Sequence, residues 1–448
     1  MGTITALSTP RGTGALSVIR LSGSHALEII RKFTPVVELQ PRLATLTKIF
    51  YPGTTQVLDQ AVITFFPAPR SLTGEDVVEL SCHGSPAVVQ QIIRLTLDHG
   101  ARLAGPGEFS LRALQNGKID LAQAEAIRDL IESQTQAAAK QAALQLSGEL
   151  SKVLAPAKAN LIEAIVILES ALEFVEDDLP PPQLNRLEEM IATVSNEVES
   201  LRKSYRVGRL IREGFKVAIL GQPNVGKSSL FNRLVETDRA IVTAIPGTTR
   251  DTLSETIDVD GIPVTLTDTA GLRETSDEIE VLGMERTQRA ATDADLVLLV
   301  LDFTKEISKA ERNLLEQNSS LQLVVVNKCD LNISHDLNRF NGLESHINVS
   351  AKTGEGLEQL RKMLVTSCTE VHPDSEPGLV ITNLRHHDLL SRAIAELEGC
   401  LHLLRTKASE ELVVAPLHNA LRLLGEVTGE TSTEDLLTQI FSTFCIGK

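Results

Sequence analysis

The 448-residue sequence contains little that would support a disulfide-rich, zinc-stabilised or membrane-spanning protein. It has no tryptophan and five cysteines, which are Cys82, Cys329, Cys368, Cys400 and Cys445. Because the cysteines are odd in number and include no Cys-x-x-Cys pair, neither a disulfide framework nor a structural zinc site is encoded. No apolar run approaches the roughly 20 residues that cross a bilayer, and the first residues lack a signal-peptide core. We therefore expect a cytoplasmic protein with no membrane partner.

Positive charge is also scarce. The chain has 43 Lys and Arg against 59 Asp and Glu, and a formal net charge of −16. This balance argues against a large basic surface that binds the phosphates of a nucleic acid. Because only 3% of the residues are aromatic, few side chains could stack on bases. Any nucleic-acid substrate would need local basic patches or a partner that holds it. The length predicts roughly two to four globular domains.

The first half of the chain changes from mixed structure to helix. In residues 3–117 the β-type runs "ALSVIRLSG", "QAVITFFPAP" and "DVVELSCHG" alternate with helical stretches such as "SPAVVQQIIRLTLDHG", which predicts an α+β domain. Residues 120–208 are rich in Ala, Leu, Gln and Glu at helical spacing, which predicts long helices. The prolines at 180–182 must interrupt these helices.

The second half adds an α/β segment and then returns to helix. In residues 215–367 strands and helices alternate as in a doubly wound sheet, and residues 382–444 read as helix with Thr433 as an N-cap. We therefore predict a multidomain α/β protein in which the α/β domain is inserted into a split helical domain. The expected domains are residues 1–118, 119–212, 213–372 and 373–448.

The stretch "GQPNVGKSS" predicts a phosphate-binding loop. It follows the apolar strand "FKVAIL" and opens the helix "SSLFNRL", which is the context that a GxxxxGK[ST] loop requires. Gly221 and Gly226 let backbone N–H groups face the phosphates, Lys227 supplies a point charge, and Ser228 can ligate Mg²⁺. The alternative is a glycine-rich turn that arose by chance. The flanking strand and helix make this interpretation weaker than a phosphate-binding loop.

Three further motifs follow in the order expected of a GTP-binding protein. "DTAG" comes after the strand "IPVTLT", "NKCD" ends "LQLVVV", and "SAK" ends "HINV", so all three lie at the carboxyl edge of the sheet. The Asp330 carboxylate can accept both N1–H and the exocyclic amine of guanine, whereas adenine offers no such pair of donors. The motifs predict GTP contacts at Asn224, Val225, Gly226, Lys227, Ser228, Ser229, Asp268, Thr269, Ala270, Gly271, Asn327, Lys328, Asp330, Ser350, Ala351 and Lys352.

The residue that orients the attacking water is not the usual one. Small GTPases place a Gln directly after the glycine of "DTAG", but this chain has Leu272 there. The downstream stretch "LRETSDEIEVLGMER" offers Glu274, Asp277, Glu278 and Glu280, although most of these are better explained as the solvated start of a helix. Arg250 or Arg273 as a catalytic finger is a weaker interpretation, because a cation held by an Asn carbonyl and loop oxygens can serve the same role.

Segments along nearly the whole chain together resemble one family. They are "TPRGTGALSVIRLSG", "SLTGEDVVELSCHGSP", "GPGEFSLRALQNGKIDLAQAEAIRDLI", "GQPNVGKSSL", "AIVTAIPGTTRDTL", "DTAGLRETSDEIE" and the terminal "FCIGK". This combination is similar to the signatures of the tRNA-modification GTPases called MnmE or TrmE.

The resemblance implies a three-part fold and a coupled activity. Its parts are an N-terminal domain similar to tetrahydrofolate-binding aminomethyltransferases, a helical domain, and a Ras-like GTPase inserted in that domain. It implies homodimers through the N-terminal domains and potassium-dependent GTP hydrolysis. It also implies that, with the flavoprotein MnmG, the protein adds an aminomethyl-type group to C5 of the wobble uridine of certain tRNAs. A folate, as 5-formyl- or 5,10-methylene-tetrahydrofolate, supplies the one-carbon unit.

The resemblance also assigns residues. It adds the loop of Thr243, Ala244, Ile245, Pro246, Gly247, Thr248 and Thr249 to the GTP site. It places K⁺ at Asn224, Thr243, Ile245 and Thr248, and Mg²⁺ at Ser228 and Thr249. It makes Glu280 the residue that orients the attacking water. It places folate at Arg20, Glu79, Lys118 and Lys448. Pro246 departs from the family pattern, in which a small residue is expected. Without the resemblance, Arg20 and Glu79 would be read as a structural ion pair between strands.

The terminal "FCIGK" leaves two roles open for Cys445. A prenylation box has the same outline, but Lys448 is the wrong final residue for one. The resemblance places Cys445 at the dimer centre facing the folate pocket, where it could act as a nucleophile or acid–base group during one-carbon transfer. The alternative is a buried thiol that packs the end of a helix.

A ribosome-assembly GTPase that acts as a binding switch is the competing function. Such proteins usually carry a basic RNA-binding module, whereas acidic side chains outnumber basic ones in residues 373–448. A GTP-regulated folate carrier without an RNA role differs from the main hypothesis only in whether uridine modification depends on the gene. The charge balance therefore favours the tRNA-modification hypothesis, with most of the tRNA contact made by the partner.

Overall fold

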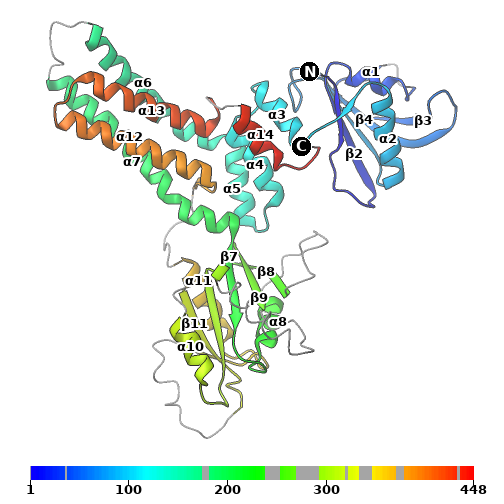
Figure 1. Ribbon diagram of the computed structural model, residues 1–448. Helices are drawn as coiled ribbons and strands as arrows, with labels where there is room; N and C mark the ends of the chain where they lie inside the picture. The colour runs from blue at the N-terminus through cyan, green and yellow to red at the C-terminus, as the bar shows by residue number, and fades with distance from the viewer. Residues whose placement is uncertain are drawn as a thin grey trace. The chain divides into compact units, whose positions relative to one another are not determined.

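The computed structural model describes residues 2–35, 38–173, 181–237, 253–268, 292–317, 321–331, 346–369, 378–430 and 434–447 (Figure 1). By their internal contacts these fall into two units. One consists of Met1–Arg128, Gln145–Ala192 and Ala395–Lys448, and the other of Asp129–Leu144 and Thr193–Ile394. None of the helices in this described part of the chain is long and apolar enough to span a membrane.

The first unit begins with a six-stranded sheet covered on one face by helices. The strand order is β3 (Thr45–Phe50), β4 (Val57–Phe66), β5 (Val77–His83), β2 (Leu16–Ser22), β1 (Ile4–Leu7) and β6 (Arg102–Leu103), and only the β1·β6 pair is parallel. Alternate side chains point to one face, where they pack against α1 (Ala26–Arg31) and α2 (Pro86–Asp98). The predicted α+β character of this segment is confirmed.

The opposite face of this sheet carries polar side chains and is partly covered by α3 (Glu108–Gln115). Phe109 packs with Ile4 there. Beside it the Arg112 guanidinium, 1% exposed, donates to Glu75 Oε2 (2.8 Å) and Glu108 Oε1 (3.0 Å). Burial raises the pKa of Glu108, but hydrogen bonds from Arg102, the Gly105 N–H and Arg112 outweigh it and lower the pKa to about 2. This ionised network fixes α3 against the sheet.

The helical part of the first unit is built from segments far apart in the sequence. Helix α6 (Glu149–Glu173) lies beside α13 (Glu410–Thr428) (Figure 1). The buried face of α6 includes Leu154, Leu161 and Leu168, at a seven-residue spacing that keeps them on one side of a helix. Helix α14 (Glu434–Ser442) packs through Phe441 onto α4 (Leu121–Glu132). Thr433, the predicted N-cap of this helix, lies outside the described residues.

The second unit contains a parallel sheet with one antiparallel edge strand. Its order is β12 (His346–Val349), β11 (Leu321–Asn327), β10 (Leu296–Asp302), β7 (Phe215–Leu220), β9 (Ile262–Asp268) and β8 (Leu253–Val259), with only β8·β9 antiparallel. All seven residues of β10 are buried, as expected for a central strand with apolar clusters on both faces. Its helices include α8 (Lys227–Thr237), α10 (Lys309–Gln317) and α11 (Leu357–Thr369).

This sheet stands in the chain between two helices of the helical block, α7 (Pro181–Glu213) and α12 (Leu384–Arg405). The predicted fold, an α/β domain within a split helical domain, is therefore confirmed. Helix α7 begins within the run of prolines that the sequence predicted to interrupt the helices.

The returning chain after the sheet is held against α5 (Gln136–Leu146) and α7. Gln141, 3% exposed, donates to the Gly378 carbonyl (2.9 Å) and accepts from the Val380 N–H (3.1 Å). Ser204 accepts a hydrogen bond from the Ile381 N–H (3.0 Å). At Gly208 an added Cβ would lie 2.1 Å from the Ile381 carbonyl oxygen, so the two backbones touch.

We predict that Gly208→Ala destabilises the protein although alanine favours helix. The new methyl group would overlap the Ile381 carbonyl, which should cost about 1–3 kcal/mol and exceed the gain of about 0.5–1 kcal/mol from helix propensity. Thermal unfolding of the full chain measures the effect. Gly399→Ala in α12 is the matched control, because nothing lies within 4 Å of a Cβ at that position, and it should not lower the midpoint. Equal midpoints for both variants would contradict the close contact.

Candidate functional site

The predicted phosphate loop connects β7 to α8 in a conformation that only glycine fits at two positions. Gly221 has φ of 149°, and a Cβ there would lie 2.4 Å from the Val300 carbonyl oxygen. Gly226 has φ of 96°, and a Cβ there would lie 2.3 Å from the Asn327 side-chain amide nitrogen. Asn224 also adopts a positive φ, 66°, which Asn tolerates better than most residues. The loop is therefore pressed onto the ends of β10 and β11.

The side chain of Lys227, the first residue of α8, folds back and contacts this loop. Its side chain is 6% exposed, and its ammonium donates to the carbonyls of Gly221 (2.6 Å) and Gln222 (2.8 Å). A buried ammonium at a helix N-terminus, beside a turn of backbone N–H groups, is suited to bind phosphate. The adjacent Val225 is buried and Ser229 is exposed on the first turn of the helix.

Ser228 and Asp268 come together beside the loop. The Ser228 hydroxyl donates to Asp268 Oδ2 at 2.7 Å, and Asp268 is 2% exposed at the carboxyl end of β9. A hydroxyl and a carboxylate are hard oxygen donors of the kind that Mg²⁺ prefers. These two residues therefore fit the predicted magnesium site, whereas its other predicted ligand, Thr249, lies outside the described residues.

The two motifs predicted to recognise guanine lie next to one another. Asp330 Oδ1 accepts a hydrogen bond from the Ser350 hydroxyl at 2.7 Å, which orients the carboxylate. The Asn327 amide donates to the Val225 carbonyl (2.9 Å) and accepts from the Ala351 N–H (3.0 Å), so it joins the phosphate loop to the "SAK" turn. Lys352 is exposed. The structure thus brings the described residues of three separate motifs to one edge of the sheet.

Cys329 lies within the second of these motifs. Burial, and then the negative charges of Glu355 and Asp330, raise the pKa of its thiol. A thiol kept protonated in this way is a poor nucleophile. This agrees with the interpretation of Cys329 as a packed residue at the end of a strand.

Sequence reasoning missed Asp302, the last residue of β10. Its Oδ2 lies 2.6 Å from the Lys328 ammonium, which also donates to the Asn224 carbonyl (2.8 Å). The signal in the sequence was an acid ending an otherwise wholly apolar strand, "LVLLVLD". Because strand order decides its neighbours, the sequence could not show that this acid meets the "NKCD" lysine.

Several predicted residues lie outside the described part of the chain. They are Thr243, Ala244, Ile245, Pro246, Gly247, Thr248, Thr249, Thr269, Ala270, Gly271, Glu280 and Lys448. Of the predicted K⁺ ligands the structure describes only Asn224, and the predicted water-orienting residue is not described.

Two of the predicted folate residues, Arg20 and Glu79, lie on the polar face of the first sheet. Arg20 on β2 and Glu79 on β5 stand directly opposite in the strand register, and Arg20 Nε donates to Glu79 Oε1 at 2.9 Å. The guanidinium lies 5.7 Å from the centre of the Phe109 ring. The exposed Lys118 packs its aliphatic stem near Gly74. The strand-to-strand ion pair expected without the resemblance is therefore present.

The C-terminal segment docks onto this same face within one chain. Pro106 and Ile446 form an antiparallel bridge, and the Gly447 carbonyl accepts from the Ser8 hydroxyl (3.2 Å) and from Arg20 Nη1 (3.4 Å). Cys445 is exposed in the single chain, whereas the alternative interpretation expected a buried thiol that packs the end of a helix. The structure brings the tail to Arg20, one of the predicted folate residues.

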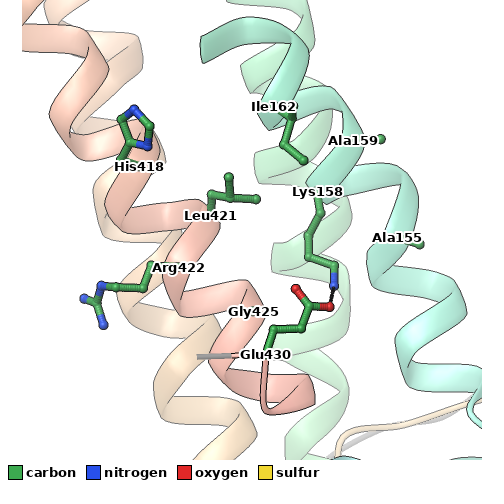
Figure 2. A pocket seen from close by; sticks show the side chains of 9 residues that line it. All are labelled: Ala155, Lys158, Ala159, Ile162, His418, Leu421, Arg422, Gly425 and Glu430. Atoms are coloured by element: carbon green, nitrogen blue, oxygen red, sulfur yellow. Dashed lines mark hydrogen bonds and ion pairs between the residues drawn. The ribbon is translucent and has the colours of Figure 1, made fainter. Parts of the chain in front are cut away.

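A separate hollow of about 530 Å³ lies between α6 and α13 (Figure 2). No predicted site residue lines it. Its wall includes the exposed Ile162 and an ion pair between Lys158 and Glu430. Nothing in its lining resembles the motifs of the nucleotide site.

Comparisons with known proteins cover the chain from end to end. A family model described as GTP-binding protein TrmE N-terminus matches residues 3–118, and one described as MnmE helical domain matches residues 121–445. The tRNA modification GTPase MnmE of Koribacter versatilis is 42% identical, covering 100% of this chain and 99% of its own. The protein of the same name from Aquifex aeolicus is 43% identical over 99% of each chain. A crystal structure of an Aquifex aeolicus Era variant bound to GDP.AlF4- aligns with 42% of this chain and 67% of its own, at 26% identity and a TM-score of 0.28.

We predict that Asp330→Asn weakens GTP binding by about 10- to 100-fold, as expected when a charged hydrogen-bond acceptor is lost, and favours xanthine nucleotide. The amide cannot accept two N–H bonds from guanine, but it can donate to the extra carbonyl at C2 of xanthine. Titration of the variant with fluorescent GTP and XTP measures the preference. The Ser350 hydroxyl can still donate to the Asn oxygen, so the fold should be unaffected. An unchanged base preference would place guanine elsewhere.

Proposed function

The chain belongs to the MnmE family of tRNA modification GTPases, and on this premise we propose that it is a potassium-dependent GTPase that modifies tRNA. With a flavoprotein partner it adds an aminomethyl-type group to C5 of the wobble uridine of certain tRNAs, using a folate one-carbon unit. The observation that carries the GTPase part is the convergence of Lys227, Ser228–Asp268 and Asp330–Ser350 at one edge of the sheet.

The described residues support specific roles in GTP binding. Lys227 would neutralise charge on the β- and γ-phosphates, and Asp330 would accept the guanine N–H groups. Ser228 and Thr249 would hold Mg²⁺, with Asp268 reaching it through water. The magnesium ion, when bound, supplies positive charge at the phosphates. Thr243–Thr249 and Thr269–Gly271 complete the proposed GTP site.

We propose that K⁺ takes the place of a partner's arginine. Leu272 cannot orient water, and Asn224, Thr243, Ile245 and Thr248 would offer oxygen ligands next to the phosphates. The ion would supply positive charge where it develops between the β- and γ-phosphates. Glu280 would orient the attacking water.

We propose the polar face of the first sheet as the folate site. Arg20 orients the Glu79 carboxylate, and an oriented carboxylate can accept the paired N–H donors of a pterin ring. Lys118 and Lys448 would pair with the carboxylates of the folate tail, and the exposed Cys445 would act near the one-carbon unit. The folate supplies that unit as a 5-formyl or 5,10-methylene derivative.

The remaining proposals concern partners and organisation. The protein would be a cytoplasmic homodimer through its N-terminal domains, joined by the flavoprotein MnmG. Because its net charge is −16, tRNA would be held mainly by that partner. The proposed domains are residues 1–118, 119–212, 213–372 and 373–448.

Nucleoside analysis of total tRNA from a deletion strain tests the function as a whole. The proposal expects the modified wobble uridine to disappear and to return when the gene is restored. A complete set of modified nucleosides in the deletion strain would reject the tRNA role and favour a binding switch or a folate carrier.

We predict that the purified protein hydrolyses GTP without an external activator and does so about ten times faster or more in K⁺ than in Na⁺, because only K⁺ would fit among the loop oxygens. Steady-state phosphate release in matched chloride buffers measures this difference. Glu280→Ala provides the control, since it should lose hydrolysis in both buffers while keeping GTP affinity. Equal turnover of the wild-type protein in the two salts would reject the potassium site.

We predict that Cys445→Ser leaves GTP hydrolysis within about two-fold of wild type and abolishes tRNA modification, because the thiol and the nucleotide motifs are in different domains and a lost nucleophile stops group transfer. The tail docks through backbone groups of Ile446 and Gly447, so this change should not release it. Phosphate release and nucleoside analysis of a complemented strain measure the two activities. Wild-type modification by the Ser variant would show that the thiol has no chemical role.

A further inference from the structure

Asp302 is a buried carboxylate whose two oxygens have different partners. Its side chain is 2% exposed. Oδ1 accepts hydrogen bonds from the Thr304 N–H (2.9 Å) and the Thr304 hydroxyl (2.7 Å), which fixes the orientation of the carboxylate. Oδ2 faces the Lys328 ammonium at 2.6 Å. One oxygen therefore anchors the carboxylate to its own turn, and the other is presented to the lysine.

The sheet register brings the backbones of these two residues together. Asp302 on β10 stands opposite Asn327 on β11, so the next residue, Lys328, begins beside the carboxylate. Lys328 has a positive φ of 71°, which is uncommon for a residue with a long side chain. Lys328 adopts this backbone conformation directly after the last residue of β11, within the guanine-recognition motif.

The same lysine reaches the phosphate loop. Its ammonium donates to the Asn224 carbonyl at 2.8 Å, and Asn224 also has a positive φ, 66°. A chain of contacts thus runs from Asp302 through Lys328 to the loop that precedes Lys227. Asn tolerates a positive φ, but Lys does so less readily, so the conformation of Lys328 depends on the contacts around it.

The carboxylate is charged at neutral pH. Burial raises the pKa of Asp302, but the hydrogen bonds from Lys328 and Thr304 outweigh it, so the pKa lies below the usual range for Asp. The lysine therefore faces a fixed negative charge. Without that charge its flexible four-carbon stem would be free to turn toward water.

We propose that Asp302 is a positioning residue for guanine-nucleotide binding, which acts by holding the Lys328 ammonium on the Asn224 carbonyl. The inference rests on the proposed GTP site and adds a residue that lies outside its motifs. Asp302 itself would touch neither phosphate nor base. Its effect would pass through Lys328 to the shape of the phosphate loop, so it should lower nucleotide affinity and, once K⁺ is saturating, leave the chemical step unchanged.

The test is Asp302→Asn in the full-length protein. The amide keeps the size of the side chain and can still accept from Thr304, but it presents no charge to Lys328. We expect the dissociation constant for fluorescent GDP to rise about ten-fold, as for loss of a charged contact. With K⁺ at saturating concentration, KM for GTP should rise in parallel while kcat stays within about two-fold of wild type.

Asp260→Asn is the matched control. Asp260 also forms an ion pair, with 3.5 Å between its Oδ1 and Arg361 Nη2, but its side chain is 64% exposed at the β8–β9 turn. Asn is accepted at its φ of 51°. The same chemical change there should leave GDP affinity at the wild-type value. If both variants lose affinity equally, the effect is not specific to Asp302 and the proposal is wrong.

A double-mutant cycle with Lys328→Met separates positioning from a general structural role. Once Lys328 is replaced, Asp302→Asn should cause no further loss of GDP affinity. The double variant also removes both charges of the ion pair, so it leaves neither partner unpaired and should fold even where Asp302→Asn alone does not. Additive losses, or unchanged affinity in a folded Asp302→Asn variant, would overturn the inference. Failure of the wild-type protein to bind GDP would instead reject the GTP site itself.

Discussion

The parallel hydrogen-bonded ladder through β9, β7, β10, β11 and β12 decides where the described nucleotide-site residues lie. Parallel strands share a direction, so their carboxyl ends meet at one edge. Apolar clusters pack on both faces of this sheet and hold it in the interior of the unit. Strand pairing therefore brings motifs separated by more than a hundred residues to the same edge, where side-chain hydrogen bonds such as Asn327 to the Val225 carbonyl join them. The residues brought to that edge are Gly221, Asp268, Asp302, Asn327 and Ser350.

The first sheet uses a different strategy to present chemistry. It is mostly antiparallel, and only one face is covered by a continuous apolar cluster. Charged side chains are then held on the other face by cross-strand pairing, as Arg20 and Glu79 are, or by burial within an ion-pair network, as Arg112 is. Positions in this sheet depend on side-chain partners, whereas positions at the edge of the parallel sheet depend on the backbone.

The sequence was sufficient to predict those parts of the structure that depend on residues close together in the chain. A strand, a glycine turn and a helix start are encoded within about a dozen residues, so the phosphate loop and the α/β fold could be predicted, and the family resemblance was confirmed by relatives that match the full chain. Contacts set by strand order could not be predicted. The Asp302–Lys328 pair needs β10 and β11 to be neighbours. Ile446 pairs with Pro106, and no local sequence pattern connects these two residues. Only the approach of the C-terminal segment to Arg20 was predicted, because the family resemblance placed Arg20 and Lys448 in the same folate site.

The packing of α6 against α13 has a consequence for biosynthesis. The two helices are separated by the whole parallel sheet, so Leu154, Leu161 and Leu168 of α6 emerge from the ribosome long before α13. At about 5–20 residues per second, many seconds pass between the synthesis of α6 and that of α13, while the intervening sheet is made. All strands of that sheet lie between the two helices in the chain, so its core can form in this interval. The contact between α6 and α13 can form only afterwards, so translation completes the helical block after the sheet that is inserted in it.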